Sequence, residues 1–360
     1  MPKHWLRTRY RLSADFNTYM KITKAHRGNY ITFFDASDEE ALALVNWVAY
    51  CREKGQNSRD ASANDLWKGW LDETFIGFSG SNKILLHSGH RVPASYHFNN
   101  RQKPDNLGRL LKRGISLLKR GVAEPSPEEL MARYRRCYPG VKMDTQEVEW
   151  GQDLIRQYLN SHEIYEILRR YAVPLDPSSL NFVFEIGAGA GMNLALLLRR
   201  EGCEKTGAVI CDLPQTMMAG YVFLRSALPD FQIKFPHEFD STNPIRPSQI
   251  QFIVPDQIAD LPDDSFDLGI NTNSFQEMEL ETVNDYLAHS ARLLSTGGLF
   301  ISNNSRNARY IENNTLDRWD VSLFLEKILE REAIFLQANC GLDDRALHQG
   351  QGGVVTVWEK

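Results

Sequence analysis

Short apolar runs alternate with longer amphipathic segments along residues 181–360. Apolar runs bounded by turn residues are typical of buried strands, and apolar positions three and four apart are typical of helices. The pattern predicts strands at 181–186, 207–211, 231–235, 251–254, 266–271, 298–302, 333–337 and 354–358, and helices at 192–200, 214–227, 279–294 and 321–331. This alternation indicates an α/β fold with a mostly parallel sheet covered on both faces, and the closely spaced last two strands indicate an antiparallel edge.

Residues 1–178 show a different pattern, with helical spacing of apolar positions and intervening loops. Residues 38–50 begin with acidic side chains and carry their apolar positions on one helical face, and further helices are predicted between 106 and 171. Pro174, Asp176 and Pro177 predict a linker. The chain is therefore expected to consist of a mainly helical N-terminal region, 1–178, and a second domain, 179–360.

The composition is that of a soluble globular protein, with 42% hydrophobic and 24% charged residues among 360. The longest apolar stretch, 183–198, is interrupted by a glutamate and three glycines and is too broken to span a bilayer of ~30 Å. The N-terminus is basic but lacks the apolar run of a secretory signal. We therefore expect a cytoplasmic protein without a transmembrane segment. The five cysteines match no metal or redox spacing, no clear carboxylate set is present, and no metal is expected.

The net charge of −5 is unevenly distributed. Residues 1–180 carry 27 basic and 21 acidic side chains, whereas residues 181–360 carry 14 basic and 25 acidic ones. The acidic second half argues against a nucleic-acid partner, whereas the basic first half keeps that alternative open. Residues 101–120 hold seven basic residues and one acid, which indicates either a solvated helix or a surface for an anionic acceptor or the inner membrane face.

A glycine-rich loop lies between the strand predicted at 181–186 and the helix that follows. Its glycines are Gly187, Gly189 and Gly191, and such residues permit a tight turn and close approach of a ligand. A dinucleotide fingerprint needs its third glycine three residues after the second, a position that Met192 occupies here. Since no Lys-Ser or Lys-Thr pair follows, the loop does not match a P-loop either.

An acidic residue ends the next predicted strand. Asp212 stands directly after residues 207–211, where a carboxylate can accept two hydrogen bonds from the hydroxyls of a ribose. The alternative is a helix N-cap before Pro214, and the two roles are compatible.

Four segments resemble the class I methyltransferases in order and spacing: EIGAGAG at 185–191, DLP at 212–214, LPDDSFDLGI at 261–270 and LLSTGGLFIS at 293–302. The resemblance covers about residues 181–360 and implies a Rossmann-like, seven-stranded, mostly parallel sheet with S-adenosyl-L-methionine as the cofactor. It implies that the three loop glycines contact the methionine part, Asp212 the ribose, and Asp256 or Gln257 the adenine, although an ordinary polar loop is the alternative for the last two. The further cofactor contacts that it implies are Glu185, Ala188, Leu213 and Asn271.

The acceptor side is expected after the strand at 266–271. The segment NTNSFQEM at 271–278, with DLPQT at 212–216, NNSR at 303–306 and the helical N-terminal region, resembles bacterial sugar O-methyltransferases. The resemblance implies methyl transfer to a hydroxyl of a sugar or glycosylated acceptor, from a surface polysaccharide or a secondary metabolite. Asn273, Asn303 and Arg306 are the expected substrate contacts, and the N-terminal region is expected to recognise the substrate or to form a lid.

Two residues, Glu277 and His90, are the candidates for the general base. Related small-molecule O-methyltransferases often carry a catalytic histidine where this chain has Gln276, and glutamine cannot take a proton. Glu277 is the first alternative, although an acid at a helix start can also serve backbone N–H groups. His90 is the second, in a stretch with His87 and His97 that would lie in the lid.

Other functions remain compatible with the sequence. A methyltransferase of a phenolic or amine natural product would share the cofactor motifs, and an NAD-binding oxidoreductase is disfavoured by the glycine spacing. A further alternative is a non-catalytic relative that binds a partner protein. Peripheral membrane contact and a homodimer are also compatible with the sequence.

Overall fold

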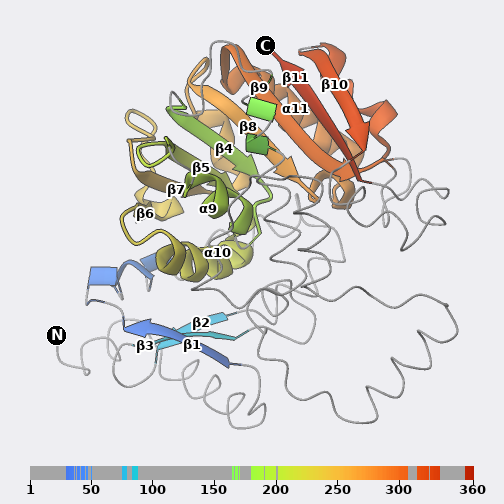
Figure 1. The fold of residues 1–360 in the computed structure, drawn as a ribbon. Helices are drawn as coiled ribbons and strands as arrows, with labels where there is room; N and C mark the ends of the chain where they lie inside the picture. The colour runs from blue at the N-terminus through green and yellow to red at the C-terminus, as the bar shows by residue number, and fades with distance from the viewer. Residues whose placement is uncertain are drawn as a thin grey trace, which may run out of the picture.

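The computed structural model describes most of the C-terminal half and parts of the N-terminal half (Figure 1). The described residues are 30–35, 75–78, 83–87, 180–189, 191–199, 202–306, 314–323, 325–332 and 353–360, with single positions between 37 and 50 and between 164 and 170. The predicted strand at 333–337, the basic segment 101–120 and His90 lie outside them.

Within the described residues, eight strands form one mixed sheet, in the order β10-β11-β9-β8-β4-β5-β7-β6 (Figure 1). Their bounds are β4 Phe182–Ile186, β5 Gly207–Cys211, β6 Gln232–Lys234, β7 Gln249–Ile253, β8 Phe266–Thr272, β9 Leu294–Ser305, β10 Glu326–Glu332 and β11 Gly353–Glu359. All neighbours from β6 to β9 pair in parallel, and β11 runs antiparallel between β9 and β10. The predicted Rossmann-like α/β fold and its antiparallel edge are confirmed. The implied count of seven strands is wrong, because the short strand β6 extends the sheet beyond β7.

In the C-terminal part that the structure describes, helices cover the sheet, namely α9 (Met192–Leu198), α10 (Pro214–Ala227) and α11 (Leu280–Leu293). Alternate residues of a strand point to opposite faces, and on β4 Val183 belongs to the core that α9 and α10 cover. Phe184 belongs to the core that α11 covers. Both sheet faces are therefore buried, which explains why the central strands read as continuous apolar runs.

The prediction of a helix at 321–331 is wrong for its second half. Residues 326–332 form strand β10, which pairs with β11 from Glu326 opposite Glu359 to Glu332 opposite Val354. Glu, Lys, Leu and Arg favour helices, but pairing with a neighbouring strand decides the conformation of an edge segment. Charged side chains along such an edge discourage pairing with another chain.

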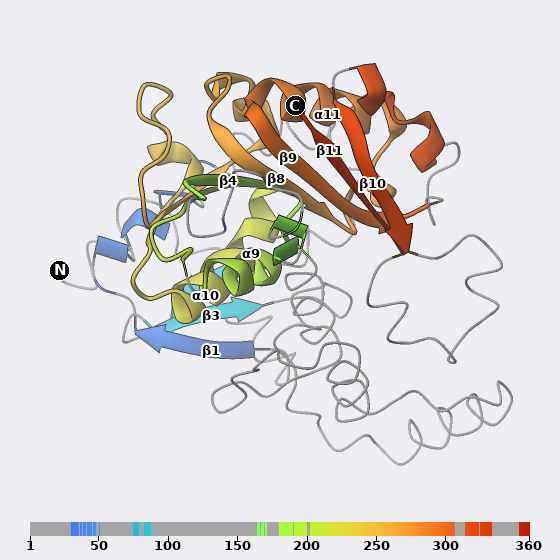
Figure 2. The same cartoon turned by 45° about the horizontal axis from the view of Figure 1, so that its top comes forward.

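The N-terminal region contains strands that the helical prediction did not include. β1 (Tyr30–Asp35), β2 (Phe75–Phe78) and β3 (Lys83–His87) form an antiparallel sheet in the order β1-β3-β2. Figure 2 shows β3 beside α10, and β2 and β3 both contact that helix.

The two predicted parts of the chain share one core in the described residues. Trp47 is fully buried, and its ring stacks on Phe235 with centroids 4.8 Å apart. Ile164 and Leu168 belong to the same core as α9 and α10. The boundary near residue 178 stays a prediction, and the described segments on its N-terminal side pack directly on the sheet domain. No helix in the described part of the chain is long and apolar enough to cross a membrane.

Candidate functional site

The glycine-rich loop lies at the carboxyl end of β4, where the strand order reverses. The chain passes from β4 to β5 on one side, whereas β8 lies on the other. Ligands of open α/β sheets bind beyond the carboxyl ends of the strands at such a switch point. The fold therefore places the loop where a ligand site is expected.

All three loop glycines adopt left-handed backbone, with φ of 67° at Gly187, 60° at Gly189 and 71° at Gly191. Their N–H groups are already used within the protein. Gly187 donates to the carbonyl of Cys211 at 2.8 Å and Gly191 to that of Ala188 at 2.9 Å. Gly189 donates to Oδ2 of Asp212 at 2.7 Å. The loop thus offers none of these three N–H groups to a phosphate.

The surroundings of the glycines differ. A Cβ atom at Gly187 would lie 1.9 Å from Oγ of Ser274, and one at Gly191 would lie 2.8 Å from Leu224. At Gly189 a Cβ atom would meet no atom of the described chain within 4 Å. The centre of the loop therefore faces open space, whereas its two ends are packed against the turn after β8 and against α10.

Asp212 stands at the carboxyl end of β5 and is partly exposed. Its Oδ2 accepts from Gly189, and its Oδ1 accepts from the backbone N–H of Leu213 at 2.7 Å. Burial raises the pKa of Asp212 to about 7, although both hydrogen bonds act to lower it. Each carboxylate oxygen can accept a second hydrogen bond, so Asp212 keeps acceptor capacity for a ligand hydroxyl.

Glu185 is buried and is the second-last residue of β4, close to α9. Its Oε1 accepts from Nδ2 of Asn193 at 3.4 Å, and the same Nδ2 lies 3.3 Å from Oγ1 of Thr272. Within the described residues, Oε2 of Glu185 and Oδ1 of Asn193 have no hydrogen-bond partner. Burial, and to a smaller extent the charge of Asp212, raises the pKa of Glu185 to about 8, while the Asn193 hydrogen bond lowers it. When Glu185 is ionised, its Oε2 and the neighbouring Oδ1 of Asn193 leave this corner short of N–H donors.

The two candidate adenine contacts differ in availability. Both lie in the 3-10 helix η3 (Pro255–Asp260) after β7. Oε1 of Gln257 accepts from Val254 at 3.0 Å, and its Nε2 donates to the carbonyl of Pro236 at 3.0 Å. Asp256 is exposed. Gln257 therefore holds the loop together, and Asp256 is the residue of the two that is open to a ligand.

The segment after β8 is the predicted acceptor side. Asn271 is fully buried, donates to the carbonyl of Ile186 at 2.8 Å and accepts from Phe275 at 3.2 Å. Its amide ties the glycine loop to the turn rather than projecting toward a ligand. Asn273 has left-handed backbone with φ of 58°, a conformation that asparagine tolerates, and its N–H donates to the carbonyl of Asn303 at 2.8 Å.

The predicted catalytic and substrate residues are placed as follows. Gln276 and Glu277 lie in the 3-10 turn η4 (Phe275–Glu277) at the carboxyl end of β8, both half-buried. Oε1 of Gln276 accepts from Ser305 at 2.6 Å, which makes this side chain a strut between β8 and β9. Arg306 forms ion pairs with Glu330 at 2.7 Å and with Asp317 at 3.7 Å. His90 lies outside the described residues.

Several site residues were not found from the sequence. Ser274, Asn304 and Asn314 contact the loop or the turn through their side chains, and Asn193 bonds to Glu185 on β4. Each is a small polar residue that resembles surface sequence, and only its place in the fold distinguishes it. Among the described residues, no group of three His, Cys, Asp or Glu side chains has the arrangement of a metal site.

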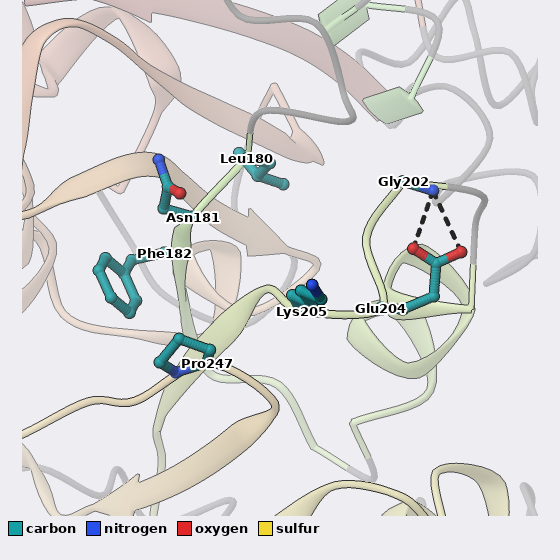
Figure 3. Close-up of a pocket in the computed structure, with 7 residues that line it drawn as sticks. All are labelled: Leu180, Asn181, Phe182, Gly202, Glu204, Lys205 and Pro247. Atoms are coloured by element: carbon teal, nitrogen blue, oxygen red, sulfur yellow. Dashed lines mark hydrogen bonds between the residues drawn. The ribbon is translucent and has the colours of Figure 1, made fainter.

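A separate cavity of about 450 Å³ lies where β4, β5 and β7 begin, and Figure 3 shows the residues that line it. Its lining consists of residues that precede β4, β5 and β7 or begin β4: Leu180, Asn181, Phe182, Gly202, Glu204, Lys205 and Pro247. The five residues of β4 separate it from the glycine loop by roughly 16 Å. This cavity is therefore not part of the switch-point site.

No protein-family model and no curated protein sequence matches the chain. Solved structures with a similar fold include a geranyl diphosphate methyltransferase in complex with GPP and sinefungin, with 14% identity and a TM-score of 0.37 over 55% of this chain and 78% of that one. Another is the geranyl diphosphate C-methyltransferase from Streptomyces coelicolor A3(2), with 13% identity and a TM-score of 0.39 over 66% of this chain and 99% of that one. StiE O-MT shares 18% identity, with a TM-score of 0.36 over 54% and 73%. These similarities are weak, so the functional conclusion rests on the site itself.

Proposed function

We propose that this protein is an S-adenosyl-L-methionine-dependent methyltransferase whose cofactor binds along the glycine loop. The observation that carries the proposal is the imbalance of hydrogen-bonding groups at the switch point. The N–H groups of the three loop glycines are used internally, while Oε2 of Glu185 and Oδ1 of Asn193 lack donors within the described residues. Such a site suits a ligand that brings positive charge and N–H donors rather than a phosphate.

The sulfonium nucleoside supplies these groups. Its ammonium would donate to Glu185 and Asn193, its ribose hydroxyls to Asp212, and its adenine amino group to Asp256. The open space beside Gly189 leaves room for the part of the ligand that joins its ammonium group to its ribose. When bound, the cofactor supplies an electrophilic methyl group, and this chain's residues orient it and exclude water.

A dinucleotide fits the same geometry poorly. A pyrophosphate is bound by free backbone N–H groups at the start of a helix, and here those of Gly187, Gly189 and Gly191 are donated to protein carbonyl and carboxylate oxygens. A pyrophosphate would also lie beside two carboxyl groups. An NAD-binding oxidoreductase is therefore disfavoured.

For the acceptor we propose a hydroxyl of a sugar or glycosylated molecule, with Glu277 as general base and Asn273, Asn303 and Arg306 on the acceptor side. A general base contributes roughly 10²–10⁴-fold for a weakly acidic hydroxyl. Gln276 serves as a strut, since its carboxamide is bound to Ser305. That observation also supports a second candidate, an amine or phenolic acceptor, which needs less help from a base.

Calorimetry with S-adenosylmethionine, S-adenosylhomocysteine and NAD⁺ tests the cofactor assignment. We expect binding of the first two and none of NAD⁺. Asp212→Ala should lower the affinity for both nucleosides by about tenfold or more, since charge-assisted hydrogen bonds contribute roughly 1.5–3 kcal/mol. As the control, Asp260→Asn changes an exposed acid at the same edge of the sheet and should leave the affinity for both nucleosides unchanged. Tight NAD⁺ binding, or equal affinity in wild type and Asp212→Ala, contradicts the proposal.

A panel of sugars, phenols and amines with methyl-labelled cofactor tests the acceptor. Transfer to sugars, lost in Glu277→Gln, supports a hydroxyl acceptor with Glu277 as base. Transfer to phenols or amines alone refutes the sugar assignment while leaving the methyltransferase assignment intact.

A further inference from the structure

Side-chain amides bind four backbone polar groups of the turn at 275–278: the N–H groups of Phe275 and Gln276 and the carbonyls of Phe275 and Met278. Phe275 donates to Oδ1 of Asn271 at 3.2 Å, and Gln276 donates to Oδ1 of Asn304 at 3.4 Å. Asn304 in turn donates to Oδ1 of Asn271 at 2.8 Å. These contacts hold the turn from the side of the sheet, through residues at the ends of β8 and β9.

Asn314 holds the same turn from outside the sheet. It is 1% exposed, and its Nδ2 donates to the carbonyl of Phe275 at 2.7 Å and to that of Met278 at 2.6 Å. Its Oδ1 accepts from Nε1 of Trp319 at 2.8 Å. Both N–H groups of the carboxamide and its oxygen are therefore engaged, and the two carbonyls bracket Gln276 and Glu277.

Trp319 fixes the orientation of the Asn314 amide. Its buried ring stands edge-on to Phe275, with centroids 5.4 Å apart and an interplanar angle of 88°. A second tie holds the next residue, because Asn284 on α11 exchanges two hydrogen bonds of 3.0 Å with Asp320. The segment after β9 is thus attached to α11 independently of Asn314.

We infer that Asn314 is a positioning residue for methyl transfer, which holds the turn bearing Glu277 at the carboxyl edge of the sheet. The inference rests on the proposed function for its kinetic consequence, although the clamp itself is a property of the fold. A neutral carboxamide suits this role, because it donates twice without adding charge beside a cationic cofactor. Since misplacement of about 1 Å can cost about 10²-fold in rate, loss of the clamp should act on kcat.

The experiment compares Asn314→Ala and Asn314→Asp with the matched control Asn284→Ala, which breaks the neighbouring tie. Asn314→Asp keeps size and the acceptor for Trp319 but removes one donor when protonated and both when ionised, so it tests the clamp with little change in packing. Hydrogen exchange of the Gln276, Glu277 and Met278 amides reports the turn without any acceptor. Calorimetry with S-adenosylhomocysteine and kcat and KM on the acceptor panel report function.

Both Asn314 variants should speed exchange of these three amides about tenfold or more, lower kcat about 10- to 100-fold, and change KM and the affinity for S-adenosylhomocysteine less than about twofold. Asn284→Ala should change none of these. Unchanged exchange in folded Asn314→Asp overturns the inference, as does a nucleoside affinity that falls in parallel with kcat. If wild type fails to bind the nucleoside, the proposed function fails, whereas the exchange measurement still decides whether Asn314 clamps the turn.

Discussion

Replacement of Glu185 by glutamine should make the unliganded protein more stable and its cofactor binding weaker. Glu185 is 1% exposed, and its Oε2 has no partner within the described residues. Burial raises its pKa from 4.5 to about 8. Below pH 4.5 the folded and unfolded chains both hold the proton. As the pH rises, the unfolded chain releases it first, so the free energy of unfolding falls until about pH 8.

The size of this effect follows from the displaced pKa. Each pKa unit corresponds to about 1.36 kcal/mol, so the whole shift amounts to about 5 kcal/mol, of which about 3 kcal/mol is lost by pH 7. Glutamine is neutral and similar in shape to the protonated acid, so Glu185→Gln should be more stable than wild type by up to about 3 kcal/mol at pH 7. At pH 4.5 the two should differ little.

Urea unfolding of the unliganded proteins between pH 4.5 and pH 8 measures this difference. Subtraction of the wild-type curve from the variant curve cancels the pH dependence contributed by groups distant from Glu185. Such groups include His237 and His289, whose pKa values burial lowers. Asp212 remains coupled to Glu185, and Asp212→Asn should be measured alongside. A stability difference that stays constant over this range refutes the reasoning, as does nucleoside affinity in Glu185→Gln equal to that of wild type.

Three further changes test the packing around the site. Gly187→Ala should cost about 1–3 kcal/mol in thermal unfolding, because the new Cβ would overlap Oγ of Ser274 in a left-handed backbone. Gly189→Ala should cost only about 1 kcal/mol, because no atom lies within 4 Å of its Cβ, yet calorimetry should show weaker nucleoside binding. A Gly189→Ala protein with full affinity would place the ligand elsewhere. Trp47→Ala should cost about 3–5 kcal/mol, since Trp47 is fully buried and stacked on Phe235; a loss below about 1 kcal/mol would mean that this part of the N-terminal region does not support the domain.

The sheet could be predicted because its signals are local. Apolar runs at 182–186 and 207–211 and the glycines between them carry their meaning within a few residues. Asp212 was predictable for the same reason, since it directly ends β5. The positions of these residues relative to one another then followed from the parallel arrangement, in which all carboxyl ends meet at one edge.

β10 could not be predicted because its residues favour the other structure. EKILERE has helical propensity at nearly every position, and the fact that decides its conformation is a partner strand 353–359 that lies about twenty residues further on. The same holds for the N-terminal sheet, where β1 pairs with a strand about fifty residues away. Long-range pairing leaves little trace in local periodicity.

The amide contacts of the turn were also beyond local sequence signals. Asn304 lies 33 residues from Asn271, and Asn314 lies 39 residues from Phe275. An asparagine between predicted elements reads as loop or surface sequence, and only the fold shows that these side chains are buried and fully bonded. The interpretation of Asn271 as a cofactor contact stays a prediction; in the structure its amide bonds to the backbone and to Asn304.

The site therefore separates charge from positioning. The carboxyl groups of buried Glu185 and partly exposed Asp212 lie where we propose that the cationic cofactor binds, and burial raises the pKa of both. The turn on the proposed acceptor side is held by neutral carboxamides, which stiffen the backbone without the desolvation cost of ions and without a field that would compete for the sulfonium. Because the two sets share few contacts, changes in the carboxylates should act on cofactor affinity and changes in the amides on the rate of transfer. Asn271 is the exception that joins them, since its Nδ2 donates to β4 at Ile186 and its Oδ1 accepts from the turn at Phe275, and a variant there should lower affinity and rate together.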